Sequence, residues 1–180
     1  MRASSMIDET AIMLQVLAES SDHDKWDGAP FERIKRVSNT KVGDIGQEFL
    51  ERVCLELGFE CVFPINAKGK RAKQSPWDVQ INGVKFELKT ATEDVSGSYQ
   101  FNHIRYHRDY EGLICIGVSP DRIYFNIWSK AEVTTNKAGT LVTMEKGANA
   151  SYKLTKKPIS LTPISEFAES LVAFVDNFQH

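Results

Sequence analysis

Apolar residues recur along the chain at two spacings, and each spacing predicts a different element. A helix is predicted over residues 42–57, because steps of three and four residues place five apolar side chains on one face: Val42, Ile45, Phe49, Val53 and Leu57. Gly58 follows this stripe at the position where helices commonly end in a left-handed residue. The pattern therefore indicates one long amphipathic helix with a continuous buried stripe.

A period of two replaces this spacing over residues 77–89. The segments 77–81 and 84–89 both alternate apolar and polar residues, and Asn82-Gly83 lies between them. Asn-Gly is a preferred dipeptide of the two-residue type I′ turn. We therefore predict a tight β-hairpin whose register follows by counting outward from the turn.

The rest of the pattern predicts further helices and strands. Helices are predicted over residues 9–20, 31–37, 99–108 and 166–178, and strands over residues 59–65, 112–118, 122–128, 141–144 and 152–154. This order predicts a mixed α/β fold in which helices flank a central mixed β-sheet. We expect one domain over residues 1–180, with a helical segment at 6–40, a core at about 42–129, and closing strands and a helix at 131–180.

The composition is that of an ordinary soluble protein, with 42% hydrophobic and 26% charged residues. We expect a cytoplasmic protein without membrane association, because the chain has no bilayer-length apolar run and no secretory signal at its amino terminus. Three cysteines without metal-ligand spacing argue against a disulfide framework or a zinc finger. The net charge of −2 predicts no general affinity for polyanions, so nucleic-acid binding would depend on local basic clusters.

The polar face of the predicted hairpin carries the candidate chemistry. Counting from the turn sets Asp78 opposite Glu87 and brings Lys89 to the same face. Directly opposed carboxylates repel each other, so a cation between them would stabilise the pair. Mg²⁺ prefers a few carboxylate oxygens together with water and phosphate oxygens, and a nearby lysine can stabilise charge on a phosphorane. These residue types fit metal-assisted phosphodiester hydrolysis, although the solvated face of an edge hairpin would show the same pattern.

The spacing of these residues resembles the signature of the PD-(D/E)XK nuclease superfamily. The motif S-P-W-D at residues 75–78 is followed by E-L-K at residues 87–89, and in that family the two acids and the lysine lie on a β-hairpin. The segment G-D-I-G-Q-E at residues 43–48 resembles the first core helix of the family, which often contributes a further acid. One departure is that Trp77 separates Pro76 from Asp78.

The resemblance implies a restriction endonuclease-like core of the order α-β-β-β-α-β, and a Mg²⁺-dependent deoxyribonuclease similar to type II restriction endonucleases. It implies that Asp78, Glu87 and Glu48 bind the metal, with Glu51 as the second choice on the helix, and that Mn²⁺ substitutes for Mg²⁺. Lys89 would position the attacking water or stabilise developing negative charge. Double-stranded DNA is the implied substrate, and cutting both strands would require a twofold homodimer.

Two groups of polar and basic residues are candidates for DNA contact: Lys70, Arg71 and Lys73 before the hairpin, and Gln100, Asn102, His103 and Arg105 after it. Gln, Asn and Arg commonly read purine edges, although an exposed polar helix face has the same composition. Two alternatives to a restriction enzyme stay open, namely a repair or recombination nuclease that recognises DNA structure, and a DNA-binding module that does not cleave. The role of residues 131–180 also stays open between completing the sheet, dimerising and reading bases.

Overall fold

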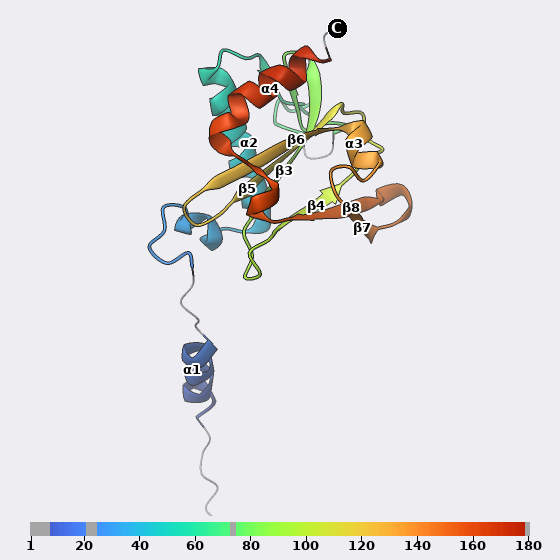
Figure 1. Ribbon diagram of the computed structural model, residues 1–180. Helices are drawn as coiled ribbons and strands as arrows, with labels where there is room; N and C mark the ends of the chain where they lie inside the picture. Colours follow the sequence, from blue (N-terminus) through green and yellow to red (C-terminus); the bar gives the residue numbers. More distant parts are fainter. Residues whose placement is uncertain (1–7, 21–24, 73–74, 179–180) are drawn as a thin grey trace, which may run out of the picture.

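A layer of helices, a six-stranded sheet and a three-stranded sheet are stacked in the computed structural model, which describes residues 8–20, 25–72 and 75–178 (Figure 1). The helices are α1 (Glu9–Ser20), α2 (Asn39–Glu56), α3 (Lys130–Thr134) and α4 (Phe167–Asp176), with 3₁₀ turns η1 (Glu32–Arg36), η2 (Gly147–Asn149), η3 (Pro158–Ser160) and η4 (Ile164–Glu166). The strands are β1 (Cys61–Val62), β2 (Val79–Ile81), β3 (Val84–Thr92), β4 (Tyr99–Ile104), β5 (Gly112–Val118), β6 (Ile123–Ser129), β7 (Leu141–Glu145), β8 (Ser151–Lys156) and β9 (Thr162–Pro163).

The larger sheet is mixed, which confirms the predicted fold class. Its strands follow the order β1-β2-β3-β5-β6-β9, in which β3 and β5 are parallel and the other neighbours are antiparallel. The smaller sheet has the order β4-β8-β7 and is antiparallel throughout. Strands from the last third of the chain therefore complete the large sheet at β9 and build most of the small one.

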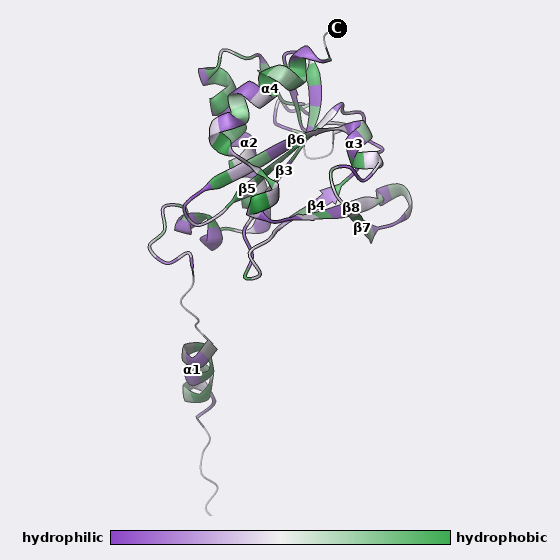
Figure 2. Cartoon of the chain, in the orientation of Figure 1, coloured by the Kyte–Doolittle hydropathy of each residue, from purple (hydrophilic) through white to green (hydrophobic). Residues whose placement is uncertain are grey.

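Each face of the large sheet packs against its own apolar core. On one face, Phe86, Leu88 and Ile114 pack with Leu50 of α2 and Leu171 of α4. The opposite face packs against the small sheet and α3, through a second cluster that comprises Tyr99, Phe101, Leu113, Trp128, Val133 and Leu154, among others. The central strands are accordingly apolar along much of their length (Figure 2). In the described part of the chain, no helix has both the length and the apolarity to cross a membrane.

The hairpin has the predicted turn and register. Asn82 and Gly83 have φ angles of 46° and 88°, the two left-handed residues that a type I′ turn requires. The side-chain oxygen of Asn82 also accepts a hydrogen bond of 2.8 Å from the backbone N–H of Glu60, which ties the turn to the end of β1. The pairs Ile81–Val84, Gln80–Lys85 and Val79–Phe86 follow the count from the turn.

Helix α2 is present, but its buried stripe differs from the predicted one. The fully buried positions are Val42, Gly46, Leu50 and Cys54, whereas Ile45 and Leu57 stay 37% and 38% exposed. Gly46 explains the shift, because a Cβ atom there would lie only 1.8 Å from Oγ1 of Thr90 on β3. The helix approaches the sheet at Gly46, which has no side chain, and a hydropathy pattern cannot reveal such a contact.

The helix predicted over residues 99–108 is wrong, because this segment forms β4. Tyr99 and Phe101 point into the second core while Gln100 and Asn102 are exposed, and β4 pairs with β8 in the small sheet. The connection between the parallel strands β3 and β5 therefore passes through a strand rather than a helix, unlike the order that the family resemblance implied. The other predicted helices and strands are found, although β1 is only two residues long.

Candidate active site

The end of the β2–β3 ladder holds Asp78 in an irregular position. Its backbone N–H donates to the carbonyl of Phe86 at 2.9 Å, and its carboxylate Oδ2 accepts a bond of 2.9 Å from the backbone N–H of Leu88. Just before β2 begins, the Asp78 carboxylate therefore takes the place of a backbone carbonyl as the hydrogen-bond acceptor for β3. Trp77, expected on the apolar face with Val79, instead packs against the second core.

Glu87 lies at the centre of the candidate site and is completely buried, with 0% of its surface exposed. Within the described residues, its oxygen Oε2 has no hydrogen-bond partner. Its closest charged contact is with Lys89, whose Nζ lies 2.6 Å from Oε1. The interpretation of this polar face as a solvated edge is wrong, because the small sheet and its core cover the face that carries Glu87.

Lys89 contacts both acids. Its Nζ is 3.7 Å from Oδ2 of Asp78 as well as 2.6 Å from Glu87. The side chains of Lys89 and Asp78 keep 17% and 21% of their surface exposed. One ammonium therefore neutralises part of the charge of two carboxylates, and solvent reaches the group from the Asp78–Lys89 side.

Burial and neighbouring charges shift the pKa values of Glu87 and Lys89 upward. Loss of solvation raises the pKa of Glu87, and the Asp78 carboxylate adds to this, against the opposing effects of Lys89 and Arg108. Burial alone would lower the pKa of Lys89, but the carboxylates of Glu87 and Asp78 outweigh it and raise that pKa. Lys89 consequently stays protonated at neutral pH, while Glu87 holds a proton more readily than an ordinary carboxyl group.

Two further residues, Arg108 and Tyr110, were not singled out for this site from the sequence. Arg108 favours the charged form of Glu87. Tyr110 is 3% exposed, and its hydroxyl has no hydrogen-bond partner among the described residues. Both residues precede β5, whose parallel pairing sets Leu113 beside Glu87. Only the strand order could have revealed this proximity, because no local pattern links residues 108–110 to β3.

The structure does not bring Glu48 to this group. Glu48 is exposed on α2 and pairs with Arg52 at 2.7 Å, while Glu51 pairs with Arg71 of the loop before the hairpin. Helix α2 packs on the face of the large sheet opposite to Glu87. Over residues 8–20, 25–72 and 75–178, no three His, Cys, Asp or Glu side chains gather as a ready-made metal site.

The candidate DNA contacts lie on two separate elements. Lys70 and Arg71 are exposed in the loop between β1 and β2, where the Arg71 guanidinium also stacks 3.8 Å from the centre of the Phe63 ring. Lys73 falls outside the described residues. The other candidates lie on and after β4: Gln100, Asn102 and His103 are exposed, and Arg105 contacts Glu145 at 3.7 Å.

Comparison with solved structures finds similar folds. No family model matches the chain, and no curated protein matches it either. The fold is similar to that of the bacterial homing endonuclease I-Ssp6803I, with a TM-score of 0.49 and 10% sequence identity, over 78% of this chain and 99% of that one. A similarity of this size does not assign an activity.

Proposed function

We propose that this protein is a Mg²⁺-dependent nuclease that hydrolyses phosphodiester bonds in DNA, with a site formed by Asp78, Glu87 and Lys89. The observation that carries the proposal is the state of Glu87. A carboxylate at 0% exposure carries a large desolvation cost: the Lys89 ammonium lies 2.6 Å from Oε1, while Oε2 has no hydrogen-bond partner in the described part of the chain. Buried acids of this kind cluster at functional sites, where a cation or substrate completes their coordination.

The residues present fit a hard divalent ion. Asp78 and Glu87 offer carboxylate oxygens beside one shared ammonium, and Mg²⁺ is usually bound by one or two carboxylates together with water and substrate phosphate oxygens. Such an ion, when bound, activates water and neutralises charge on the transferred phosphoryl group. With Glu48 paired to Arg52 elsewhere, the two acids of the hairpin are the only metal ligands that we propose.

Lys89 has the role of a fixed positive charge. Its raised pKa keeps it protonated at neutral pH, so it cannot act as the base that accepts a proton from water. An ammonium that already lies 2.6 Å from Glu87 is placed to donate hydrogen bonds to a nucleophilic water or to an oxygen that gains negative charge during cleavage.

The site is open to a substrate on one side of β3. Strand β2 pairs with β3 only as far as Phe86, and beyond that point the Asp78 carboxylate is the partner of Leu88. Lys70 and Arg71 are exposed in the loop that precedes Asp78 along the chain, and Arg71 pairs with Glu51 of α2. We propose double-stranded DNA as the substrate, with phosphate contacts from this loop and from β4.

Plasmid cleavage with matched variants tests the proposal. We expect cutting that requires Mg²⁺ or Mn²⁺, and its loss in Asp78→Asn, Glu87→Gln and Lys89→Met, each checked for folding by circular dichroism. Lys85→Met is the matched control, because Lys85 lies on the same strand but pairs with Asp109 at the surface. Discrete fragments would indicate a restriction enzyme, and cutting only at junctions or other structures a repair nuclease.

Two results would overturn the proposal. One is the absence of metal-dependent cleavage on duplex, single-stranded and branched DNA and on RNA, which would leave a DNA-binding module at most. The other is cleavage by Asp78→Asn and Glu87→Gln at the wild-type rate, which would show that the acids of the hairpin are not required for the reaction.

A further inference from the structure

Helix α1 has an apolar surface that its own chain leaves uncovered. Five large apolar side chains are between 49% and 62% exposed, namely Ile12, Met13, Leu14, Val16 and Leu17. In Figure 1 the helix lies apart from the sheets, and in Figure 2 much of it is coloured as apolar. A twelve-residue helix is marginal in water without packing, and a helix with so much apolar surface is normally buried. Helix α1 therefore needs a surface to pack against.

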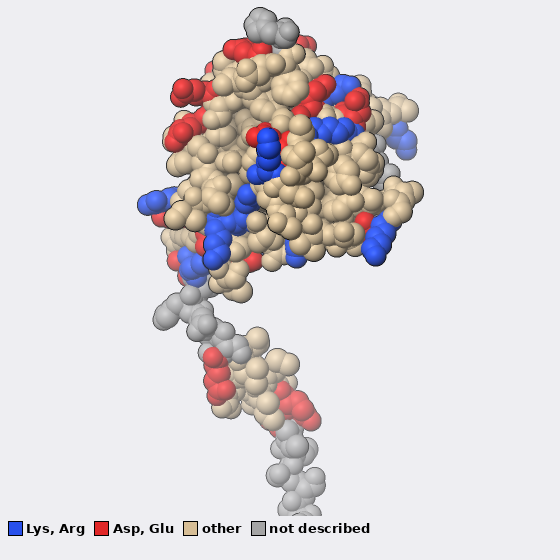
Figure 3. Space-filling view, turned by 45° about the vertical axis from the view of Figure 1, so that its right-hand side comes forward, with Lys and Arg blue, Asp and Glu red and all other residues tan. Residues whose placement is uncertain are grey.

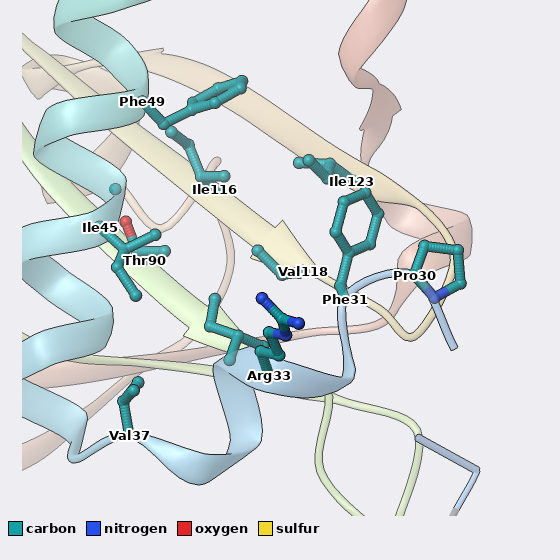
Figure 4. A pocket seen from close by; sticks show the side chains of 12 residues that line it. Pro30, Phe31, Arg33, Val37, Ile45, Phe49, Thr90, Ile116, Val118 and Ile123 are labelled. Atoms are coloured by element: carbon teal, nitrogen blue, oxygen red, sulfur yellow. The ribbon is translucent and has the colours of Figure 1, made fainter. Parts of the chain in front are cut away.

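An apolar groove of about 370 Å³ lies on the helical face of the large sheet, between η1, α2, β5 and β6. Its walls include Phe31, Val37, Ile45, Phe49 and Ile123 (Figure 4). Ile34 of η1 also lines the groove. Arg33 and Thr90 are the polar side chains among the residues that line it. Small polar ligands are usually held by several converging polar groups, so this lining favours a row of aliphatic side chains instead.

The charges of the two surfaces are complementary. The charged residues of α1 are Glu9 and Glu19, both acidic. The turn η1, which borders the groove, carries Arg33, Lys35 and Arg36 together with Glu32, which pairs with Arg36, so the turn keeps a net positive charge. The space-filling view shows acidic and no basic colour on α1, and basic colour interspersed with some acidic colour on the lower part of the domain (Figure 3). Opposite charges around an apolar contact fix its register and favour the encounter of the two surfaces.

We propose that α1 of one copy of this chain docks into the groove of a second copy, and that the exchange is reciprocal. Reciprocal exchange of one element gives a closed twofold dimer, and both complementary surfaces are present on a single chain. The groove is on the face of the large sheet opposite to Glu87, so a helix docked in it does not itself cover the candidate active site of that copy. The proposal does not depend on the nuclease chemistry.

Complementation between two variants tests the exchange. The full chain should be a dimer by light scattering coupled to size exclusion. A helix variant, Leu14→Asp with Leu17→Asp, and a groove variant, Ile45→Glu with Arg33→Glu, should each weaken the dimer by about 100-fold or more. An equimolar mixture of the two should recover dimers, because an intact helix meets an intact groove in the mixed pair. Val95→Asp, at a fully exposed valine outside both surfaces, should leave the dimer unchanged.

Other occupants of the groove give different results, and each would overturn the proposal. A full chain that stays monomeric at every concentration would mean that α1 docks on its own domain or on another molecule. A groove variant that remains dimeric while the helix variant does not would mean that two α1 helices pair with each other. If the charged substitutions lower the melting temperature, milder variants replace them: Leu14→Ala with Leu17→Ala for the helix and Ile45→Ala for the groove. Each of these must also weaken the dimer, and their equimolar mixture must recover it.

Discussion

Replacing Lys89 by methionine should destabilise the metal-free protein strongly at neutral pH. Lys89 is the nearest counter-ion of two carboxylates, one of them fully buried, so its removal leaves two like charges without compensation. Breaking a buried ion pair by removing one partner costs about 3–5 kcal/mol. We expect a loss of stability at the lower end of this range, about 3 kcal/mol, because Glu87 can take up a proton once Lys89 is removed. For a chain of this size the loss corresponds to a fall in Tm of about 6–12 °C.

The pH dependence of this loss has a definite sign. Without Lys89, the pKa of Glu87 in the folded protein rises further above its ordinary value of 4.5, because Lys89 is a neighbour that lowers it. The folded state then binds more protons than the unfolded state, so its stability falls as the pH rises from that value through the folded pKa. The deficit of Lys89→Met against the wild type should therefore be small in mild acid and largest at neutral pH and above.

Chemical denaturation at several pH values measures this effect, with and without Mg²⁺. Saturating Mg²⁺ should restore part of the lost stability, because the ion binds the folded state where the ammonium was. Lys85→Met serves as the control, with a much smaller loss expected from a surface pair whose aspartate is 74% exposed. Wild-type stability of Lys89→Met in metal-free buffer at neutral pH would refute the assignment of Lys89 as counter-ion of Glu87.

Two further predictions concern Glu87 and Gly46. In mildly acidic solution, metal binding by the wild-type protein should release a proton, because the raised pKa of Glu87 favours its protonated form there whereas the metal binds the carboxylate, and the affinity should fall as the pH is lowered. Calorimetry in buffers of different ionisation enthalpy measures the release, and a heat that does not depend on the buffer would contradict it. Gly46→Ala should cost about 1–3 kcal/mol, because its Cβ would lie 1.8 Å from Oγ1 of Thr90, and Thr90→Ala in the same chain should recover part of this. Gly43→Ala on the same helix meets nothing within 4 Å and should be neutral or stabilising, so an equal loss in both variants by urea denaturation would refute the packing argument.

The hairpin could be predicted from the sequence because its determinants are local. Asn82-Gly83 selects the turn, and once the turn is known the alternation leaves one register that buries Val79 and Phe86 together. This register places Glu87 and Lys89 on one face, and Asp78 joins them from just beyond the paired residues, where its carboxylate accepts a hydrogen bond from the N–H of Leu88. The strands β5 and β6 could also be predicted from local sequence, because two apolar runs flank a short turn that contains Pro120.

The wrong prediction of a helix over residues 99–108 also has a local cause. Its buried residues are Tyr99, Phe101 and Ile104, so the spacing changes from two to three within one strand. The change arises at a bulge, where His103 has a φ of 58° and the pairing with β8 shifts register. A step of three is what a helical pattern shows, and the sequence alone does not distinguish the two.

The burial of Glu87 could not be predicted, because the elements that cover it come from far along the chain. Alternation over residues 77–89 shows that one face of the hairpin is apolar, but it says nothing about what packs on the polar face. In the structure that face is closed by β4 and β8, and β8 lies more than sixty residues after Glu87. The same pattern is thus compatible with a solvated edge and with a buried site, and only the tertiary structure distinguishes them.

The absence of Glu48 from the group has a consequence for how the site would bind a metal. Asp78 and Glu87 already share an ammonium, so a divalent ion must displace Lys89 from at least one of them and gains only two protein carboxylates. An ion that replaces an existing ion pair gains less free energy than one that enters a site with uncompensated charge. Mg²⁺ should consequently bind weakly to the free protein and tighter when DNA phosphates supply the missing oxygens. On this argument a metal ion and a DNA substrate should bind cooperatively, and Lys89 would compensate the charge of the buried acid until both are bound.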